Sequence, residues 1–234
     1  MVYSNTMTHD SVNGLLRWTR RATRRGPLRL LLCLGLVPIL SGATLLASKD
    51  GDKDSIKAKK KARVLVLVYS RTDTTWTVAR DIARRFNADL VRIRAPEYPV
   101  GVLGNQKASR DALDEKTSAK ITPASVDLRP YKLVFIGGPI WWYRPAVPLW
   151  AVVQANRFQG KSVVLFNTFN SRFKQENIHK FRKLIEGRGG RWLDHIYVRR
   201  GRVYWQLSRK ELLSRMRAQI KARSAGWLKS AGLK

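Results

Sequence analysis

The chain has little cysteine, histidine or acid. Its one cysteine, Cys33, excludes a disulfide within the chain. The three histidines are far apart in the sequence and lack the spacing typical of a metal site. The glycine patterns of known phosphate loops are missing too, both the G-x-G-x-x-G of dinucleotide-binding proteins and the G-K-[ST] of nucleoside-triphosphate loops. These absences exclude a disulfide-stapled fold and give no basis for a metal centre or for either nucleotide site.

The shortage of acid is large: 16 acidic residues stand against 46 basic ones, for a net charge of +30 and a pI near 11.3. Such a surplus favours contact with anionic lipid, nucleic acid or acidic proteins. The basic residues are spread along the chain and form no known nucleic-acid-reading motif. They are densest beside an uncharged segment, where anionic lipid explains them better. We therefore expect an anionic membrane surface as a partner, and no specific nucleic acid.

That uncharged segment follows a basic N-terminal region. The basic region covers residues 1–29, and residues 30–48 carry no charge, which is near the lower limit of about 20 residues for crossing a bilayer. The segment fits either a membrane anchor or a signal peptide cleaved after Ala43, and the arginine pair at 24–25 loosely resembles a twin-arginine export signal. Lysines in a charged linker at 49–61 nearly cancel the orientation bias. We predict a membrane-associated or exported protein and leave its topology open.

The sequence predicts a globular domain at residues 62–223 and a C-terminal tail at 224–234. Apolar, β-branched runs indicate strands, and apolar residues at helical spacing indicate helices. We expect strands at 63–69, 89–94, 132–136, 162–167 and 192–198, and helices at 74–86, 146–156, 175–186 and 208–223, with a shorter helix near 109–116. Ser208 and Glu211 have the spacing of a capping box. This alternation predicts an α/β fold with a doubly wound, five-stranded parallel sheet.

Two segments locate a candidate binding site. Residues 64–77 read VLVLVYSRTDTTWT and residues 133–143 read LVFIGGPIWWY, each an apolar run that ends in a polar or aromatic loop. Runs of this kind are typical of strands buried on both faces of a parallel sheet. Because parallel strands end at the same edge, we expect the two loops to form a binding site at the carboxyl edge of the sheet.

The first loop is rich in hydroxyl groups, from Ser70, Thr72, Thr74 and Thr75. It leads into a helix, whose first backbone N–H groups are unpaired and whose dipole favours an anion. The alternative is ordinary helix capping by serine or threonine. Four hydroxyl residues in six positions exceed what one cap needs, so this loop favours a phosphate.

The second loop is aromatic, with Trp141, Trp142 and Tyr143 in succession. Three consecutive bulky rings cannot all point into one core, so at least one is expected to be exposed or to cover a flat ligand. The alternative is a hydrophobic lid or a patch that binds a partner. Taken with the hydroxyl loop, the aromatic loop indicates a ligand with a planar, apolar ring and a phosphate tail.

Three segments, in order, resemble the flavodoxin family. YSRTDTTWTVARDIA resembles its phosphate loop, FIGGPIWWYRPAVP its flavin-contacting segment, and KSVVLFNTF its next strand and loop. The resemblance implies the flavodoxin-like strand order 2-1-3-4-5, FMN as the cofactor, and electron transfer. It assigns the phosphate to Ser70, Arg71, Thr72, Thr74 and Thr75, the flavin ring to Pro139, Ile140, Trp141, Trp142 and Tyr143, and a third loop to Thr168, Phe169 and Asn170.

The chain departs from the family pattern in three ways. Asp73 stands where the family has glycine, which takes positive φ without steric cost. The third loop lacks the family's glycines, and the chain is basic where electron-carrying flavodoxins are acidic. We expect an FMN-binding protein that acts in electron transfer or as a flavin-dependent reductase, with an acidic redox partner and no catalytic side chain, because the cofactor carries the chemistry. The alternative is a membrane interaction module that has kept the fold and lost FMN.

Overall fold

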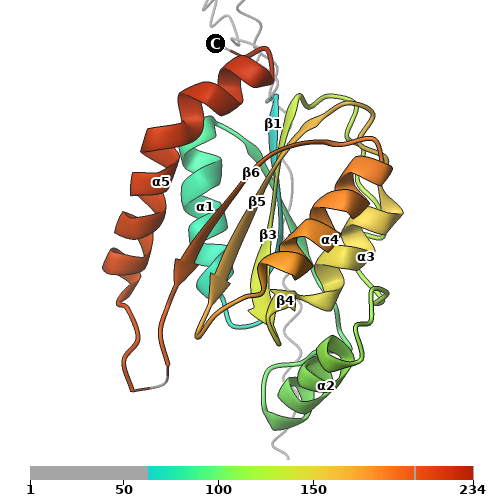
Figure 1. Cartoon of the computed structure of the whole chain (residues 1–234), viewed down its shortest axis with the longest axis vertical. Helices are drawn as coiled ribbons and strands as arrows, with labels where there is room; N and C mark the ends of the chain where they lie inside the picture. Colours follow the sequence, from blue (N-terminus) through green and yellow to red (C-terminus); the bar gives the residue numbers. More distant parts are fainter. Residues whose placement is uncertain (1–62, 203, 234) are drawn as a thin grey trace, which may run out of the picture. The chain divides into compact units, whose positions relative to one another are not determined.

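The computed structural model describes residues 63–202 and 204–233. The predictions for residues 1–61, with the anchor or signal segment and the linker, lie outside these residues. The described residues form an α/β unit in which helices cover both faces of a central sheet (Figure 1). The predicted fold class is therefore confirmed.

Five long strands run parallel in the sheet. They are β1 (Val64–Tyr69), β2 (Asp89–Ile93), β3 (Leu133–Trp141), β5 (Ser162–Phe169) and β6 (Arg191–Arg199). Their order across the sheet is β2-β1-β3-β5-β6, which is the predicted arrangement 2-1-3-4-5 of the long strands. The prediction of five strands omitted one element, because a two-residue strand, β4 (Arg144–Pro145), pairs antiparallel with the end of β3.

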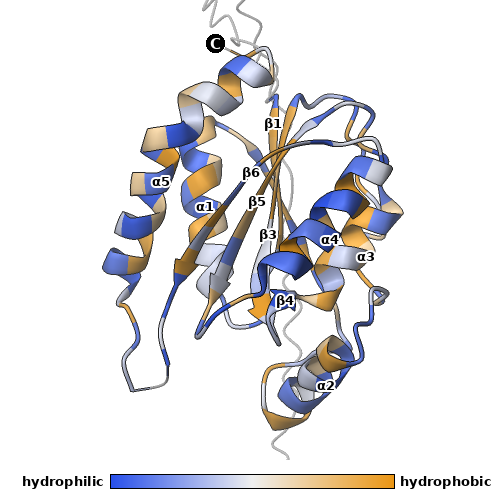
Figure 2. Ribbon diagram, in the orientation of Figure 1, coloured by the Kyte–Doolittle hydropathy of each residue, from blue (hydrophilic) through white to orange (hydrophobic). Residues whose placement is uncertain are grey.

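The helices form two layers. They are α1 (Thr74–Phe86), α2 (Val102–Leu113), α3 (Val147–Ala155), α4 (Gln175–Gly187) and α5 (Arg209–Ser230). α1 and α5 cover one face of the sheet, and α3 and α4 cover the other (Figure 1, Figure 2). In β1, Leu65 and Leu67 pack on the α3–α4 side, while Val66 and Val68 pack against α1 and α5. Because both faces are buried, the strand is apolar at every position. Among the described helices, none is both long and apolar enough to cross a bilayer.

α5 continues past its predicted end near Arg223. Its last turns are held by Trp227, whose side chain is buried and packs edge-on against Phe135 with 5.8 Å between ring centres. At the other end, Ser208 and Glu211 form the predicted capping box. The capping signal is local in sequence, whereas the extension depends on packing against the sheet.

α2 begins just after Gly101, earlier than the helix predicted near 109–116. The buried carboxylate of Asp111 ties α2 to the buried Tyr98 side chain by accepting a hydrogen bond from the Tyr98 hydroxyl (2.9 Å). It also accepts hydrogen bonds from the ammonium groups of Lys107, within α2 (2.6 Å), and of Lys116, just after it (2.7 Å). Burial acts to raise the pKa of Asp111, but these bonds outweigh it and lower the pKa to about 2. The position of α2 therefore depends on tertiary contacts more than on an apolar pattern.

Gly137 in β3 pairs with Phe166 in β5, and the Phe166 ring lies against it. A methyl group on Gly137 would overlap that ring, which is fully buried. We expect Gly137→Ala to lower the free energy of unfolding by about 1–3 kcal/mol, because the ring has no space to move.

The matched control is Gly226→Ala in α5, where the added carbon meets no atom within 4 Å. Helix propensity alone should then raise the free energy of unfolding by about 0.5–1 kcal/mol. Urea denaturation measures both variants. Equal effects of the two substitutions would contradict the packing argument at Gly137.

Candidate functional site

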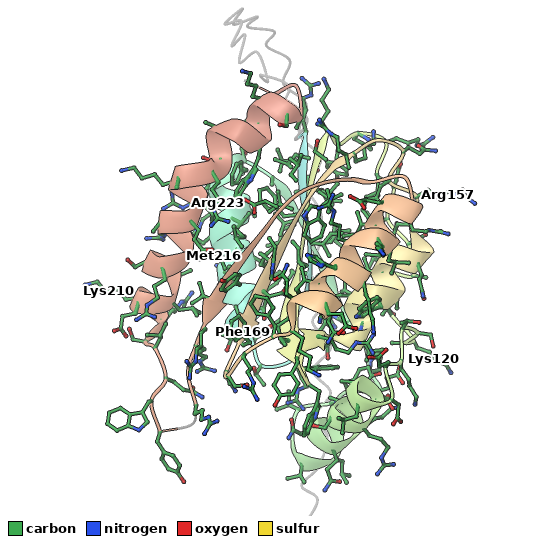
Figure 3. The ribbon with its side chains drawn as sticks, viewed as in Figure 1. Lys120, Arg157, Phe169, Lys210, Met216 and Arg223 are labelled. Carbon is green, nitrogen blue, oxygen red and sulfur yellow. The ribbon has the colours of Figure 1, made fainter. Side chains whose placement is uncertain are left out.

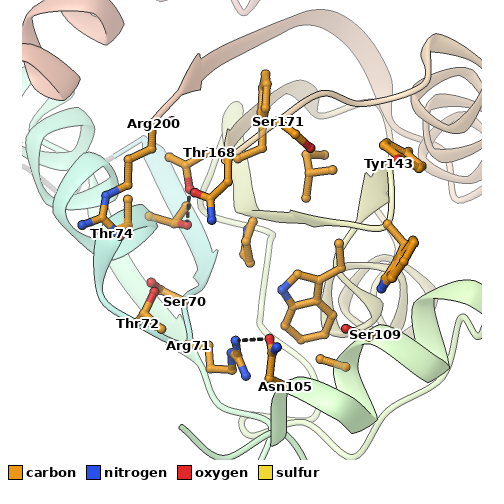
Figure 4. Close-up of a pocket in the computed structure, with 18 of the residues that line it drawn as sticks. Ser70, Arg71, Thr72, Thr74, Asn105, Ser109, Tyr143, Thr168, Ser171 and Arg200 are labelled. Carbon is orange, nitrogen blue, oxygen red and sulfur yellow. Dashed lines mark hydrogen bonds between the residues drawn. The ribbon is translucent and has the colours of Figure 1, made fainter. Parts of the chain in front are cut away.

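A pocket opens at the carboxyl edge of the sheet, where β1, β3 and β5 end (Figure 4). Its volume is about 400 Å³. All the residues predicted for the site line it: Ser70, Arg71, Thr72, Thr74, Thr75, Pro139, Ile140, Trp141, Trp142, Tyr143, Thr168, Phe169 and Asn170. The structure thus brings the three predicted loops together around one cavity.

Some lining residues were not predicted. α2 contributes Asn105, Ala108 and Ser109, and the chain after β5 and β6 contributes Ser171, Arg172 and Arg200. Arg200 directly follows β6, so extending the same strand-end rule to the last strand would have found it. α2 offered no such signal, because tertiary contacts place it.

The hydroxyl loop between β1 and α1 uses its side chains in two ways. The buried Thr75 hydroxyl lies 2.8 Å from the Thr168 hydroxyl, and this bond joins the first loop to the third. The Thr74 hydroxyl accepts a hydrogen bond from Arg200 at 2.9 Å. Figure 4 shows Ser70 and Thr72 next to each other on the pocket wall. Two of the hydroxyls therefore hold the loops together, and two remain for a ligand.

Asp73 takes the conformation that glycine would give this loop. Its backbone is left-handed, with φ at 59°, at the N-cap of α1. Its carboxylate accepts a hydrogen bond from Arg92 Nη2 at 2.6 Å and is not part of the pocket lining. The Arg92 guanidinium in turn lies 4.9 Å from the centre of the Trp76 ring. The negative charge of Asp73 is thus paired outside the pocket.

The aromatic loop is a tight β-hairpin. β3 continues through Trp141, which pairs with Arg144, and this leaves Trp142 and Tyr143 as a two-residue turn. Both residues have positive φ, at 42° and 67°, as a type I′ turn requires. Bulky side chains rarely adopt this conformation. The Tyr143 carbonyl accepts a hydrogen bond from the Lys174 backbone N–H at 2.9 Å, which fixes the turn against the start of α4.

The two tryptophans of the hairpin have different surroundings. Trp141 packs edge-on against Tyr69 and Tyr98, with ring centres 5.6 Å and 5.1 Å away. Trp142 is 47% exposed and lines the pocket. The expectation that at least one ring of this run would be exposed is confirmed.

The pocket wall is cationic. Its lining residues include no aspartate, glutamate or histidine. Arg71 donates from Nη2 to Asn105 Oδ1 at 2.9 Å, and its Nη1 is buried without a hydrogen-bond partner among the described residues. Buried donors are nearly always paired in native proteins, so an open one at a pocket indicates an acceptor ligand. An anion that enters this pocket meets guanidinium and hydroxyl groups.

Hydrogen bonds among His195, Asn167 and the Gly138 carbonyl support the third loop. Phe169 packs against Tyr197, and His195 lies beside Tyr197. His195 Nε2 is 2.9 Å from Asn167 Oδ1, and Asn167 Nδ2 donates to the Gly138 carbonyl at 2.8 Å. Burial lowers the pKa of His195 to about 4, so its ring is neutral at neutral pH.

The comparison with protein families gives one match: the family model described as flavodoxin fits residues 63–205. The chain belongs to the flavodoxin family. The matched residues include β1, β3 and β5 and all the predicted pocket residues. No curated protein matches the chain.

Solved structures of two proteins, both provisionally described as flavoproteins, share the flavodoxin-family fold. The one from Bacteroides eggerthii is 20% identical, with a TM-score of 0.55 over 70% of this chain and 99% of that one. The one from Bacteroides uniformis is 21% identical, with a TM-score of 0.54 over 66% of this chain and 97% of that one. At these identities the likeness concerns the fold.

The Thr75–Thr168 bond predicts a coupled pair of substitutions in the flavodoxin-family pocket. Thr75→Val removes one hydroxyl and leaves the other buried without its partner, which should lower the free energy of unfolding by about 1–3 kcal/mol. Thr168→Val should lower the free energy of unfolding by a similar amount. The double variant should lose less than the sum of the two single losses, because no orphaned hydroxyl remains. Strict additivity in urea denaturation would contradict the bond.

The neutral His195 should make the flavodoxin-family domain sensitive to acid. Its pKa is about 4 in the folded protein and about 6.5 in an unfolded chain, so the unfolded state binds the proton first. The stabilisation is full above a pH of about 6.5 and is lost as the pH falls towards 4. We expect His195→Gln to reduce this loss by at most about 3.4 kcal/mol, which corresponds to a pKa difference of about 2.5. His179→Gln, at an exposed position, is the matched histidine control. Equal pH profiles of the unfolding free energy for the two variants would count against the assignment.

Proposed function

We propose that the pocket binds FMN and that the protein acts in electron transfer, as a carrier or as a flavin-dependent reductase. The observation that carries the proposal is that the two ends of the pocket differ in chemistry. Hydroxyl groups, a helix N-terminus and Arg71 lie at one end, and the Trp142–Tyr143 turn lies at the other. A ligand that fills both ends has a charged tail and a flat, apolar ring.

The phosphate end rests on three contributions. The N-terminus of α1 offers unpaired backbone N–H groups and the positive end of the helix dipole. Ser70 and Thr72 add hydroxyl donors on the pocket wall. The buried Nη1 of Arg71 has no partner among the described residues and would donate to a phosphate oxygen as a charge-assisted bond.

The ring end rests on the hairpin. Trp142 and Tyr143 are held in left-handed conformations by the β3–β4 pairing and by the contact with Lys174. Such strained turns are found where the surrounding structure holds them, often at ligand sites. The half-exposed Trp142 ring provides a flat apolar surface against which a flavin can stack, while the Arg172 guanidinium lies 5.3 Å from the centre of the Tyr143 ring.

FMN, when bound, supplies the redox chemistry. The chain's own residues would bind the phosphate, orient the ring and exclude water from one of its sides. The alternative, a module that has lost FMN, rests on Asp73 and on the third loop that lacks the family's glycines. The Asp73 carboxylate is paired with Arg92 and lies outside the pocket lining, which supports retention of the cofactor.

The test is a titration of the protein with FMN and with riboflavin, which lacks the phosphate, followed by quenching of flavin fluorescence. We expect FMN to bind with micromolar or tighter affinity, and riboflavin about tenfold or more weakly, since a charged hydrogen bond contributes about 1.5–3 kcal/mol. Arg71→Ala should weaken FMN binding and leave riboflavin binding unchanged. Trp142→Ala should weaken both ligands.

The charge control is Arg157→Ala, because Arg157 lies away from the pocket and points outward (Figure 3). It should bind both ligands as the unaltered protein does. Unchanged flavin fluorescence with the unaltered protein would sink the proposal. Equal affinities for FMN and riboflavin would sink the phosphate assignment.

A further inference from the structure

Exposed apolar side chains gather around the mouth of the pocket. Among the large hydrophobic residues that the structure describes as exposed, all except Leu113 and Tyr197 lie on three segments at this edge: Val100, Val102, Leu103, Trp142, Tyr204 and Trp205. Exposed apolar residues scattered singly are normal, but a grouping of this kind marks an interaction surface.

The three segments all reach the pocket. The start of α2 carries Leu103 and also supplies Asn105 to the lining, and Trp142 lines it directly. The segment between β6 and α5 supplies Arg200. Figure 1 shows α2 and the β6–α5 segment at the same end of the domain, beyond the carboxyl ends of the strands.

The β6–α5 segment holds its two rings far out into solvent. The Leu207 backbone N–H donates to the Arg200 carbonyl at 2.7 Å and closes the segment. Gly201 has φ at 102°, and a side chain there would overlap the Trp205 carbonyl. At its tip Tyr204 is 90% exposed and Trp205 86% exposed. Tyr204 and Trp205 thus project from the domain and belong to neither core cluster.

Arginines lie beside Trp205 and beside the Trp142–Tyr143 turn. Two shallow recesses beside the pocket are lined by Arg172, Arg199, Arg200, Arg202 and Arg215, with no acidic residue in either lining. Among the described residues, Arg172, Arg199 and Arg202 form no ion pair with a carboxylate. Their charge is therefore available to an external anion.

We propose that this face binds the surface of an anionic membrane, with the mouth of the pocket towards the lipid. We define the docking face by the apolar residues Leu103, Trp142 and Trp205 and the arginines Arg199 and Arg202, together with the other exposed apolar residues and recess arginines named in this section. This inference assigns a membrane partner to the face that contains the proposed flavin site. Docking does not require bound flavin, so either proposal can fail without the other.

A lipid surface fits the face better than an acidic protein does. The apolar side chains stand on separate segments and project outward, and a bilayer interface accepts such tips without a matching shape. Tryptophan and tyrosine favour the interfacial region. Each arginine near an anionic surface adds about 1 kcal/mol of attraction. A protein partner would need a complementary socket for every tip.

The experiment uses the full chain with Cys33→Ser and a single environment-sensitive fluorophore, attached through Trp205→Cys or, as the control, through Arg157→Cys. Vesicles contain phosphatidylcholine alone or a mixture with phosphatidylglycerol, and no FMN is added. With the anionic vesicles, the label at position 205 should enter an apolar environment while the label at 157 stays in water. Because the readout is local, attachment of the chain elsewhere does not mimic it.

The contribution of charge is tested by the double substitution Arg199→Ala with Arg202→Ala, which removes two positive charges from the face. It should lower the ratio of docked to undocked label on the order of tenfold. The matched pair is Arg157→Ala with Lys161→Ala, in the chain labelled at 205. Both residues lie between α3 and β5, at the amino end of the strands and so away from the face (Arg157 in Figure 3), and the pair should leave the ratio unchanged. A label at 205 that stays in water with every vesicle overturns the proposal. So does an equal response of both label positions, or a response at 205 to polyglutamate and not to lipid, which would indicate an acidic protein partner. Normal flavin binding in a chain that fails to dock would show that only this proposal is wrong.

Discussion

The covering of the sheet by helices on both faces is the constraint on which the site depends. Because β1, β3 and β5 are buried on both sides, most of their side chains belong to the core, and polar side chains that a ligand can reach lie where the strands end. The strands are parallel, so those ends share one edge. The bond between Thr75 and Thr168 then ties two of the loops into one wall.

Much of the fold could be read from the sequence because its signals are local and strong. Buried strands need apolar residues at every position, and the Ser208–Glu211 cap depends on residues three apart. The missed elements depend on contacts made by the folded chain. α2 is held by a buried carboxylate, and the last turns of α5 are held by Trp227. The β4 hairpin was missed because its turn has Trp142 and Tyr143 where turn chemistry favours asparagine and glycine.

The site likewise has features that the sequence predicts and features that depend on contacts in the folded chain. The strand ends predict where the site lies, the resemblance to the flavodoxin family assigns its residues, and all of those residues line the pocket. The sequence could not show how Asp73 would be accommodated, because the answer lies in Arg92, on the neighbouring strand. A left-handed aspartate with a cationic partner stands in for glycine, so the loop keeps its shape with a different residue. Arg200 was not predicted as a site residue because the rule that binding residues follow strand ends was not extended to the last strand, β6.

The absence of acid from the pocket lining bears on the reduction potential of the proposed cofactor. A flavin becomes more negative when it accepts electrons, and a nearby guanidinium stabilises that added charge. Arg172 lines the pocket, and its guanidinium lies 5.3 Å from the centre of the Tyr143 ring, at the end proposed for the flavin ring. Each kcal/mol of such preference raises a two-electron potential by about 20 mV. A flavin bound beside this arginine would thus accept electrons more readily than one held in an acidic pocket.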